Sequence, residues 1–334
     1  MGAARVSVII VNYNSAHRLR KCLDCLAGQT WSDFETIIVD NNSDDGSLEA
    51  ARTHAIAPKI LALDENVGFA EGNNKAVALA TGEWLGFLNP DAYADPAWLA
   101  TLVQATEQYP EIAAFGSTQL DATNPQIIDG AGDVCHAAGI AYRGHFGWPR
   151  KLLPTRGSCF SPCAAAALYR RDVFEKLNGF DQRFFCYGED VDLGFRLRLS
   201  GGEIGQVAKA VVHHEGSGVT GRHSDFSIYY GTRNRIWLFY KNLPMLLYLG
   251  LMPVHLIFNI LMLVRAGAGG TGGAFWRGMI DGYKRLSEFN ADRRDLQSTR
   301  KLSVWQIAQL MTWSPLKLMR RQADLRMPND VSEN

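Results

Sequence analysis

The run Val6-Ser7-Val8-Ile9-Ile10-Val11, followed at once by Asn12-Tyr13-Asn14, decides the fold class of this chain. A short apolar and β-branched run of this kind is typical of a parallel strand that is buried on both faces. Comparable runs recur at residues 36–39, 59–63, 84–88 and 113–120, and segments with helical periodicity separate them. Strands that alternate with helices predict an α/β fold with a mainly parallel sheet and right-handed crossovers.

Polar side chains cluster where three of these strands end. They are found at residues 12–14 after the first strand, 40–45 after the second, and Asn89-Pro90-Asp91 after the strand at 84–88. Asn and Asp favour turns for local reasons, so one such cluster alone would carry little weight. Open sheets of this type bind ligands beyond the carboxyl ends of their strands. Three clusters at one edge therefore predict a binding site there.

The length and composition suit one large α/β domain with an extension. The chain has 334 residues, of which 47% are hydrophobic and 20% are charged, so it can bury a core. Its formal net charge is zero, which gives no argument for nucleic acid as a partner. Neither a G-x-G-x-x-G motif nor a Walker lysine loop follows the first strand, which argues against a dinucleotide enzyme or a P-loop NTPase.

The cysteine pattern favours a reducing compartment. Six cysteines form no dense framework, and no signal peptide precedes the first strand, so we expect a cytoplasmic protein. Cys22 and Cys25 form a C-x-x-C pair, but within a helical pattern and without a second pair at zinc spacing. We expect these two side chains to pack on a helix face.

The second half of the chain adds further elements. Residues 124–148 lose their periodicity and are rich in Gly, which predicts an inserted hairpin or long loop near the site. A helix is expected at residues 171–177 and another from Glu189 to about Leu199. A strand is expected over residues 203–212, ending at His213-His214.

Two of these segments carry residues suited to catalysis. Asp91 is a candidate metal ligand, since one carboxylate with phosphate oxygens and water often holds Mg²⁺. His213 or His214 would add a nitrogen ligand that also suits Mn²⁺. Glu189, Asp190 and Asp192 crowd three carboxylates at a helix start. The helix dipole stabilises such charges, and their mutual repulsion raises pKa values toward the range of a general base.

The same segments resemble glycosyltransferase family 2, in particular its bacterial rhamnosyltransferase-like branch. Five stretches carry the resemblance in the order of the family, between about residues 5 and 217: residues 8–14 (VIIVNYN), 38–47 (IVDNNSDDGS), 66–74 (NVGFAEGNN), 87–91 (FLNPD) and 179–193 (GFD through GEDVDL). The resemblance implies a GT-A fold, which is a Rossmann-like, mainly parallel central sheet flanked by helices. It also implies transfer of a sugar from a nucleotide-sugar.

The resemblance implies a role for each matching residue. Tyr13 is expected beside the base, and Asp40 is expected to accept the imide N–H of a pyrimidine. Asp190 matches the catalytic base. Asp91 matches the last carboxylate of the family's D-x-D motif, whose first position is Asn89 here. The nucleotide-sugar site is then expected to comprise Asn12, Tyr13, Asn14, Asp40, Asn41, Asn66, Gly68, Asn73 and Asn89.

The expected reaction is a single displacement that inverts the anomeric carbon. Asp190 would deprotonate the acceptor hydroxyl, and a divalent cation, Mg²⁺ or Mn²⁺, would neutralise the departing diphosphate. His213 best matches the family's late metal-binding histidine, and His214 is the alternative. Glu189, Asp192, Arg233 and Arg235 are expected to contact the acceptor or to support the site. The branch suggests dTDP-rhamnose as donor, and a UDP-hexose is equally compatible with these residues.

The C-terminal third differs in character from the rest. We expect a catalytic domain over residues 1–220 and a helical region over 221–334. Residues 243–264 form a mostly apolar segment of about 22 residues, long enough to cross a bilayer. Pro244, Pro253, His255 and Asn259 interrupt it. From Arg265 to residue 334 the chain has 12 Lys or Arg residues and 7 Asp or Glu residues, so this tail is basic.

Cations on both sides of the apolar segment oppose a single crossing. We expect helices that lie in or re-enter the membrane interface, and the alternative is a buried helical pair. This favours a location at the cytoplasmic face of the bacterial inner membrane and a glycan or polyprenyl-diphosphate-linked acceptor. Two other functions compete with this interpretation: a nucleotide-sugar-binding protein without catalysis, and a nucleotidyltransferase on a related sheet.

Overall fold

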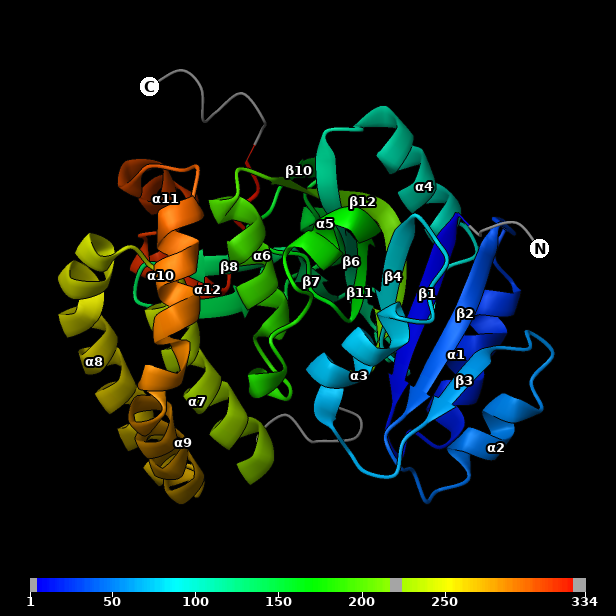
Figure 1. Cartoon of the computed structure of the whole chain (residues 1–334), viewed down its shortest axis with the longest axis horizontal. Coiled ribbons are helices and arrows are strands. Elements are labelled where there is room, and N and C mark those ends of the chain that lie inside the picture. The colour runs from blue at the N-terminus through cyan, green and yellow to red at the C-terminus, as the bar shows by residue number, and fades with distance from the viewer. Residues whose placement is uncertain (1–4, 217–223, 327–334) are drawn as a thin grey trace.

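The computed structural model describes residues 5–216 and 224–326, so the domain boundary expected at residue 220 lies outside the described residues. The chain first alternates strands and helices (Figure 1). The elements up to the inserted segment are β1 (Val6–Asn12), α1 (His17–Ala27), β2 (Phe34–Asp40), α2 (Ser47–Arg52), β3 (Lys59–Ala62), α3 (Gly68–Val77), β4 (Trp84–Leu88), β5 (Ala92–Ala94), α4 (Trp98–Gln108) and β6 (Ile112–Asp121).

The second half begins with short strands and ends in helices. Its elements are β7 (Ile128–Ala131), β8 (Asp133–His136), β9 (Ile140–Arg143), η1 (Arg150–Leu152), β10 (Arg156–Ser158), β11 (Ala166–Arg170), α5 (Arg171–Lys176), η2 (Gln182–Phe184), α6 (Glu189–Leu199) and β12 (Glu203–His214). The C-terminal helices are α7 (Asp225–Asn242), α8 (Met245–Ala268), α9 (Gly272–Lys284), η3 (Leu286–Phe289), α10 (Asn290–Thr299), α11 (Val304–Leu310) and α12 (Pro315–Arg320).

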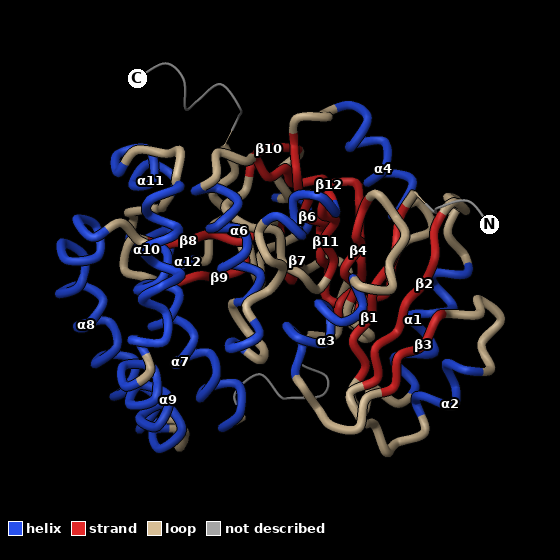
Figure 2. The backbone as a smooth tube through the Cα atoms, viewed as in Figure 1, coloured by secondary structure: helices blue, strands red, loops and turns tan. Residues whose placement is uncertain are grey.

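One large mixed sheet organises the first two thirds of the chain (Figure 2). Its strands follow the order β10-β12-β6-β11-β4-β1-β2-β3. Strands β1 to β4 are parallel, and β6 and β12 are parallel to each other. Strand β11 is antiparallel to both β4 and β6, so all six parallel strands point the same way. Their carboxyl ends therefore share one edge, and the α/β class expected from the sequence is confirmed.

The sheet separates two apolar cores. Val6, Val8 and Ile10 of β1 join the core beneath α1 and α4, whereas Ile9 and Val11 join the core beneath α3 and α6. Side chains alternate across a strand, so an unbroken apolar run buries both faces. The run that opened the sequence analysis is therefore the middle layer of a three-layer domain.

Cys22 and Cys25 both lie on α1, the helix on which we expected them to pack. Cys22 is fully buried in the core beneath α1, and both side chains are free thiols. The expected helix-face packing is confirmed for this part of the chain.

The Gly-rich segment after β6 is an inserted unit, as the sequence predicted. Strand β7 pairs with β6, and β8 and β9 form a separate antiparallel hairpin.

Strand β5 was not expected. It follows Asp91 directly and pairs antiparallel with the end of β12, placing Ala92 opposite His214.

The C-terminal helices pack beside the sheet domain, at the end opposite β2 and β3 (Figure 1). A third apolar core joins them to α6 and to the β8–β9 hairpin, with Phe195, Trp237 and Phe289 at its centre. A buried ionic network reinforces this junction. The Asp192 carboxylate on α6 accepts hydrogen bonds from Lys241 Nζ at 2.9 Å and Asn242 Nδ2 at 2.8 Å, both on α7, and from Arg196 Nε at 2.8 Å.

This network lowers the pKa of Asp192. Burial alone would raise the pKa of Asp192, but Lys241 and Arg196 lower it overall. Asp192 is completely buried and pairs with cations that are themselves buried. It holds two helices together and does not line the site.

Removing this carboxylate should destabilise the fold. Asp192→Ala leaves buried Lys241 short of a counter-charge, so we expect a loss of about 3–5 kcal/mol in the free energy of unfolding. Asp172→Ala is the matched control, because Asp172 pairs with Arg170 at a side-chain exposure of 71% and should change stability by less than about 1 kcal/mol. Urea denaturation measures both, and equal losses would contradict the structural role of Asp192.

Candidate functional site

A cleft of about 790 Å³ opens at the carboxyl edge of the sheet. Its walls come from the strand ends, from the inserted hairpin, from the start of α6 and from α7. The expected site residues that line it are Tyr13, Asn41, Asn66, Gly68, Asn89, Asp91, Glu189, Asp190, His214 and Arg235. Segments more than 100 residues apart in the sequence thus meet in one cavity, at the edge where the polar strand ends predicted it.

Asn12 and Asp40 lie beneath the cleft surface. The Asn12 Nδ2 group donates to Asp40 Oδ1 at 2.6 Å and to Ser47 Oγ at 2.8 Å, and the backbone N–H of Ser43 donates to Asp40 Oδ2 at 3.0 Å. Asp40 is 1% exposed. Asp40 therefore connects β1 to β2 and to the loop that follows β2. Its carboxylate does not reach the cleft surface, where the sequence analysis expected it to contact a base.

Asn14 has a similar local role, since its Oδ1 accepts the backbone N–H of Asp44 at 3.0 Å. Asn73 also differs from expectation. Its Nδ2 donates to the carbonyl oxygen of Phe69 one helical turn earlier, and its side chain is buried within α3. Tyr13, by contrast, is 41% exposed at the cleft rim, where a flat ligand can stack on it.

The start of α3 forms a close contact with the loop before α6. Asn41 Nδ2 donates to the Gly68 carbonyl at 3.1 Å, and Asn66 Oδ1 accepts the Gly68 N–H at 2.9 Å. Gly68 has φ +85°, and a Cβ there would lie 2.5 Å from the Phe185 ring. The N–H of Ala70 donates to the Phe185 carbonyl at 3.1 Å. Only a glycine allows the two walls of the cleft to approach this closely.

Asp91 lies against His214, and the preference for His213 is corrected. His214 Nε2 is 3.4 Å from Asp91 Oδ1, and the imidazole is buried. His213 is the next residue along β12, so it points to the other face, where its Nε2 meets Asp95 Oδ1 at 3.0 Å. Of the two candidates only His214 lines the cleft.

A second carboxylate holds the other nitrogen of His214. His214 Nδ1 lies 2.7 Å from Oδ2 of Asp129, and the same Asp129 oxygen accepts a hydrogen bond from Arg143. Burial alone would lower the pKa of His214, but the hydrogen bond to Asp129 and the nearby Asp91 carboxylate raise it overall. Asp129 is on β7 and Arg143 is on β9, so both come from the inserted segment.

Asp190 is fixed by the backbone on both sides. Its Oδ2 accepts the N–H of Ala164 at 3.0 Å, and its Oδ1 accepts the N–H of Val191 at 2.8 Å. Burial raises the pKa of Asp190, and these two N–H groups limit the rise. The carboxylate is thus held in one orientation with an affinity for protons above that of an ordinary Asp, as a general base requires.

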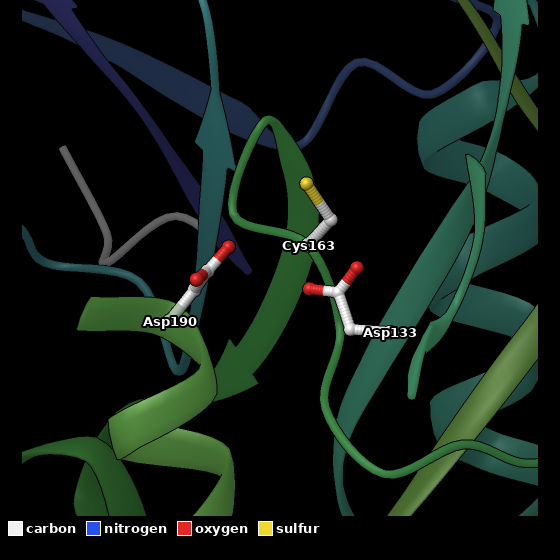
Figure 3. A group of neighbouring side chains, drawn as sticks. All are labelled: Asp133, Cys163 and Asp190. Atoms are coloured by element: carbon white, nitrogen blue, oxygen red, sulfur yellow. The ribbon is translucent and has the colours of Figure 1, made fainter. Parts of the chain in front are cut away.

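Asp133 and Cys163 share the surroundings of Asp190 (Figure 3). One ligand atom from each of the three side chains lies within 4.8 Å of the others, and the three side chains point into a common space. Burial, together with the charge of Asp190, raises the pKa of Asp133 well above its usual range. A cation bound here would use Asp190 as a ligand and remove it as a base, so Asp91 and His214 suit a catalytic cation better.

Glu189 is the third acidic group at this end of the cleft. Its Oε2 is buried and has no hydrogen-bond partner in the described part of the chain. Burial and the neighbouring Asp190 raise its pKa well above the usual range. Glu189 therefore lies beside Asp190 with a higher affinity for protons than an ordinary Glu.

Arg233 and Arg235 have different surroundings. The Arg233 guanidinium donates to the carbonyl oxygens of Arg183 and Phe184 at 3.0 and 2.9 Å, and it is buried. It therefore anchors the loop before α6, and it is not among the residues that line the cleft. Arg235 lines the cleft, and its guanidinium donates to Asn259 Oδ1 on α8 at 2.6 Å. Burial lowers the pKa of Arg235 to about 10.

Three residues near the site were not selected from the sequence: Asp133 and Arg143, which line the cleft, and Asp129, which is buried against His214. All belong to the inserted segment, whose position near the site was predicted without naming any residue. The spacing Asp129-Gly130-Ala131-Gly132-Asp133 was the available signal, because two acids separated by small residues can approach a neighbouring strand closely.

The Gly68–Phe185 contact gives a direct test of the cleft wall. Gly68→Ala would bring a Cβ into the Phe185 ring at a left-handed φ, so we expect a loss of stability of more than about 2 kcal/mol and weaker ligand binding. Gly46→Ala is the control, because Gly46 has φ +80° but no atom within 4 Å of its Cβ position. It should cost only the backbone strain, about 1 kcal/mol. Equal melting temperatures for the two variants would refute the steric argument.

Comparison with known sequences connects this geometry to a family. The model described as "Glycosyl transferase family 2" matches residues 7–178. The O-antigen biosynthesis protein RfbC of Myxococcus xanthus is 33% identical over 233 residues, which cover 64% of this chain and 18% of that protein. The N-acetylglucosaminyl-diphospho-decaprenol L-rhamnosyltransferase of Mycobacterium tuberculosis is 28% identical over 246 residues, which cover 64% of this chain and 77% of that enzyme.

Solved structures share the fold at low sequence identity. The mannosyltransferase PcManGT of Pyrobaculum calidifontis, in complex with GDP-Man and Mn²⁺, has a TM-score of 0.53 at 18% identity and covers 89% of this chain and 84% of its own. TarS 1–349 of S. aureus has a TM-score of 0.53 at 14% identity, with 91% and 90% covered. These two matches concern the fold, and they extend over the C-terminal helices as well as the sheet.

Proposed function

Because the chain belongs to glycosyl transferase family 2, we propose that it moves a sugar from a nucleotide-sugar to an acceptor hydroxyl with inversion at the anomeric carbon. The chain is a glycosyltransferase with a GT-A fold, and its relatives act in bacterial surface-polysaccharide biosynthesis. One observation carries the mechanistic proposal: Asp91, His214 and Asp190 line a single cleft although they come from distant parts of the sequence.

Asp190 is the proposed general base. Its carboxylate accepts the proton of the acceptor hydroxyl as that oxygen attacks the anomeric carbon, and the nucleoside diphosphate leaves from the opposite side. The N–H groups of Ala164 and Val191 hold the carboxylate in place during the transfer. Glu189, whose pKa burial raises well above the usual range, lines the cleft beside Asp190 and is proposed to orient the acceptor.

The residues around Asp91 fit a divalent cation. His214 Nε2 is buried and makes no hydrogen bond with any residue that the structure describes, and it faces the Asp91 carboxylate at 3.4 Å. An imidazole nitrogen and a carboxylate oxygen suit Mn²⁺ as well as Mg²⁺. A cation held by Asp91 and His214 would supply positive charge to the leaving diphosphate. Asn89 precedes it without a second charge, so substrate phosphate and water would complete the ligand set.

The nucleotide part of the donor is proposed to lie at the β1, β2 and α3 end of the cleft. Tyr13 at the rim is placed to stack on the base, and Asn41, Asn66 and Gly68 present polar groups to the ribose and diphosphate. Asp40 and Asn12 hold this wall from beneath. The mycobacterial relative's name favours an activated rhamnose as donor, and a UDP-hexose remains the alternative.

The acceptor is proposed to enter between α7 and the β8–β9 hairpin. This arm of the cleft is lined by Ile140, Tyr142, Leu238 and Arg235. Arg235 has no carboxylate within ion-pair distance among residues 5–216 and 224–326, so an anionic group on the acceptor can meet it. A polyprenyl-diphosphate-linked glycan combines such a group with an apolar chain.

Helix α8 supports a membrane-bound acceptor. Within the described residues, α8 is the single helix whose length and apolar composition would allow it to cross a membrane, which by itself is weak evidence. Its buried residues Leu251, His255 and Asn259 stand four apart, so they form one stripe. His255 Nδ1 bonds the Ala138 carbonyl at 2.8 Å, and Asn259 bonds Arg235. The polar interruptions of the apolar segment therefore face inward.

The outward face of α8 is apolar and exposed. Its exposed side chains are Met245, Leu246, Leu249, Val254, Leu256, Ile257, Ile260, Leu261 and Val264. A continuous apolar face of this size marks a membrane or protein interface. A crossing by α8 would draw α9, which packs against it and exposes Arg277 and Lys284, into lipid. We therefore place α8 flat in the cytoplasmic interface of the bacterial inner membrane.

The two competing functions lose their support. A nucleotidyltransferase does not agree with family membership. A binding protein without catalysis would have no need for a base held as Asp190 is, with two backbone N–H groups on its carboxylate.

Asp190→Asn tests the proposed reaction. The amide keeps the size of the side chain but cannot accept the proton, so kcat should fall by about 10²- to 10⁴-fold while nucleotide affinity changes little. In the wild type, activity should fall as the pH falls through the raised pKa of Asp190, above the value near 3.9 of an ordinary Asp. Transfer assays and nucleotide titrations measure both quantities. An equal loss of transfer and nucleotide binding would reject Asp190 as the base.

The double variant Ile257→Glu/Leu261→Glu tests the membrane face of α8. These side chains are 59% and 62% exposed, so folding should be unaffected. Binding to vesicles with anionic lipid should weaken by at least about tenfold, because two apolar groups no longer enter the interface. Leu79→Glu, at an exposed apolar position of the sheet domain, is the control. Unchanged flotation of the double variant would rule out this face.

A further inference from the structure

The imidazole of His214 lies between two carboxylates, and the two contacts differ in kind. Asp129 Oδ2 lies 2.7 Å from Nδ1, which is the length of a strong hydrogen bond. Asp91 Oδ1 lies 3.4 Å from Nε2, which is too long for one. Both carboxylates are nearly or completely buried, so bulk water does not weaken either contact.

This difference determines which nitrogen carries the proton. A neutral imidazole has one N–H donor and one acceptor. If the acceptor were Nδ1, its lone pair would face the Asp129 oxygen at 2.7 Å, and the two would repel each other. With the proton on Nδ1, the hydrogen bond forms and the lone pair of Nε2 is directed toward Asp91. Two electron-pair donors then face one space in the cleft, which suits a cation.

Arg143 holds the Asp129 carboxylate in position. The guanidinium donates to the same Oδ2 that accepts from His214, and the Asp129 side chain is 1% exposed. The Arg143 side chain itself remains 30% exposed and lines the cleft. The pair is supplied by β7 and β9, so the inserted segment reaches across to the end of β12.

We propose that Asp129 is a positioning residue for metal binding: it fixes the imidazole of His214 so that Nε2, together with Asp91, takes up the cation. The proposal rests on the proposed function, in which Asp91 and His214 are the metal ligands. Carboxylates that hold the second nitrogen of a metal-binding histidine typically contribute 10- to 100-fold to metal affinity. We expect Asp129 to act in this range.

The chain contains its own matched control. His213 also carries a carboxylate partner, Asp95, at 3.0 Å, but this pair lies on the other face of β12 with Asp95 43% exposed. Asp95→Asn therefore removes a histidine-bound carboxylate one residue away without touching the cleft.

The experiment is a Mn²⁺ titration of the full-length protein, followed by the electron paramagnetic resonance signal of free Mn²⁺, with and without excess dTDP or UDP. Asp129→Asn should weaken Mn²⁺ binding by about 10-fold, because the amide oxygen still accepts from Nδ1 but carries no charge. Asp129→Ala should weaken it by up to about 100-fold. Asp95→Asn and His213→Ala should bind as the wild type does. Nucleotide affinity in EDTA should be the same for all four variants.

The outcomes distinguish a failure of the proposed metal site from a failure of the positioning role of Asp129. If His214→Ala binds Mn²⁺ as tightly as the wild type, the metal site of the proposed function is wrong. If His214→Ala loses Mn²⁺ but Asp129→Asn and Asp129→Ala do not, only the positioning role of Asp129 is wrong. If Asp129→Ala does not fold, the near-isosteric Asp129→Asn decides alone, and unchanged Mn²⁺ affinity in that variant overturns the inference.

Discussion

The pairing of β5 with the end of β12 is the constraint on which the site depends. Asn89-Pro90-Asp91 follows β4 in the middle of the sheet, and His214 ends β12, which lies three strands further along the sheet. The turn redirects the chain so that Ala92 lies opposite His214, and Asp91 is brought beside the imidazole. Without this short antiparallel ladder, the ends of β4 and β12 would be separated by β11 and β6.

Glu189, Asp190 and Asp192 lie in the first turn of α6, and each has different surroundings. Asp192 faces α7 and is paired with Lys241, so it stays ionised and holds two helices together. Asp190 faces the cleft between two backbone N–H groups and keeps a raised pKa. Glu189 is buried without a partner for its Oε2, so its pKa rises further. Because one helical turn directs these side chains to different neighbours, one carboxyl group pairs with a buried cation and the other two line the cleft.

The C-terminal helices connect the cleft to an apolar outer surface. Arg235 lines the acceptor arm on one side and bonds Asn259 of α8 on the other, while His255 of α8 bonds the hairpin at Ala138. The helix that would contact lipid is thus attached directly to the arm proposed for the acceptor. In the proposed function, this arrangement would hold an amphiphilic acceptor between the membrane surface and Asp190.

The sequence by itself determined the α/β fold and the edge of the sheet where the cleft opens, and it selected Asp91 and Asp190, which both line that cleft, because strand periodicity and polar strand ends are local signals. It also located the inserted segment and the apolar helix. Tertiary structure decided that His214 and not His213 meets Asp91, since two adjacent strand residues face opposite sides and the sequence does not say which side is the cleft. It likewise placed Asp40, Asn73, Asp192 and Arg233 in buried hydrogen bonds within the protein, and it brought Asp129 and Arg143 against His214. Which atoms meet across a cleft depends on strand pairings between residues as far apart as Asp91 and His214, and no local pattern in the chain encodes them.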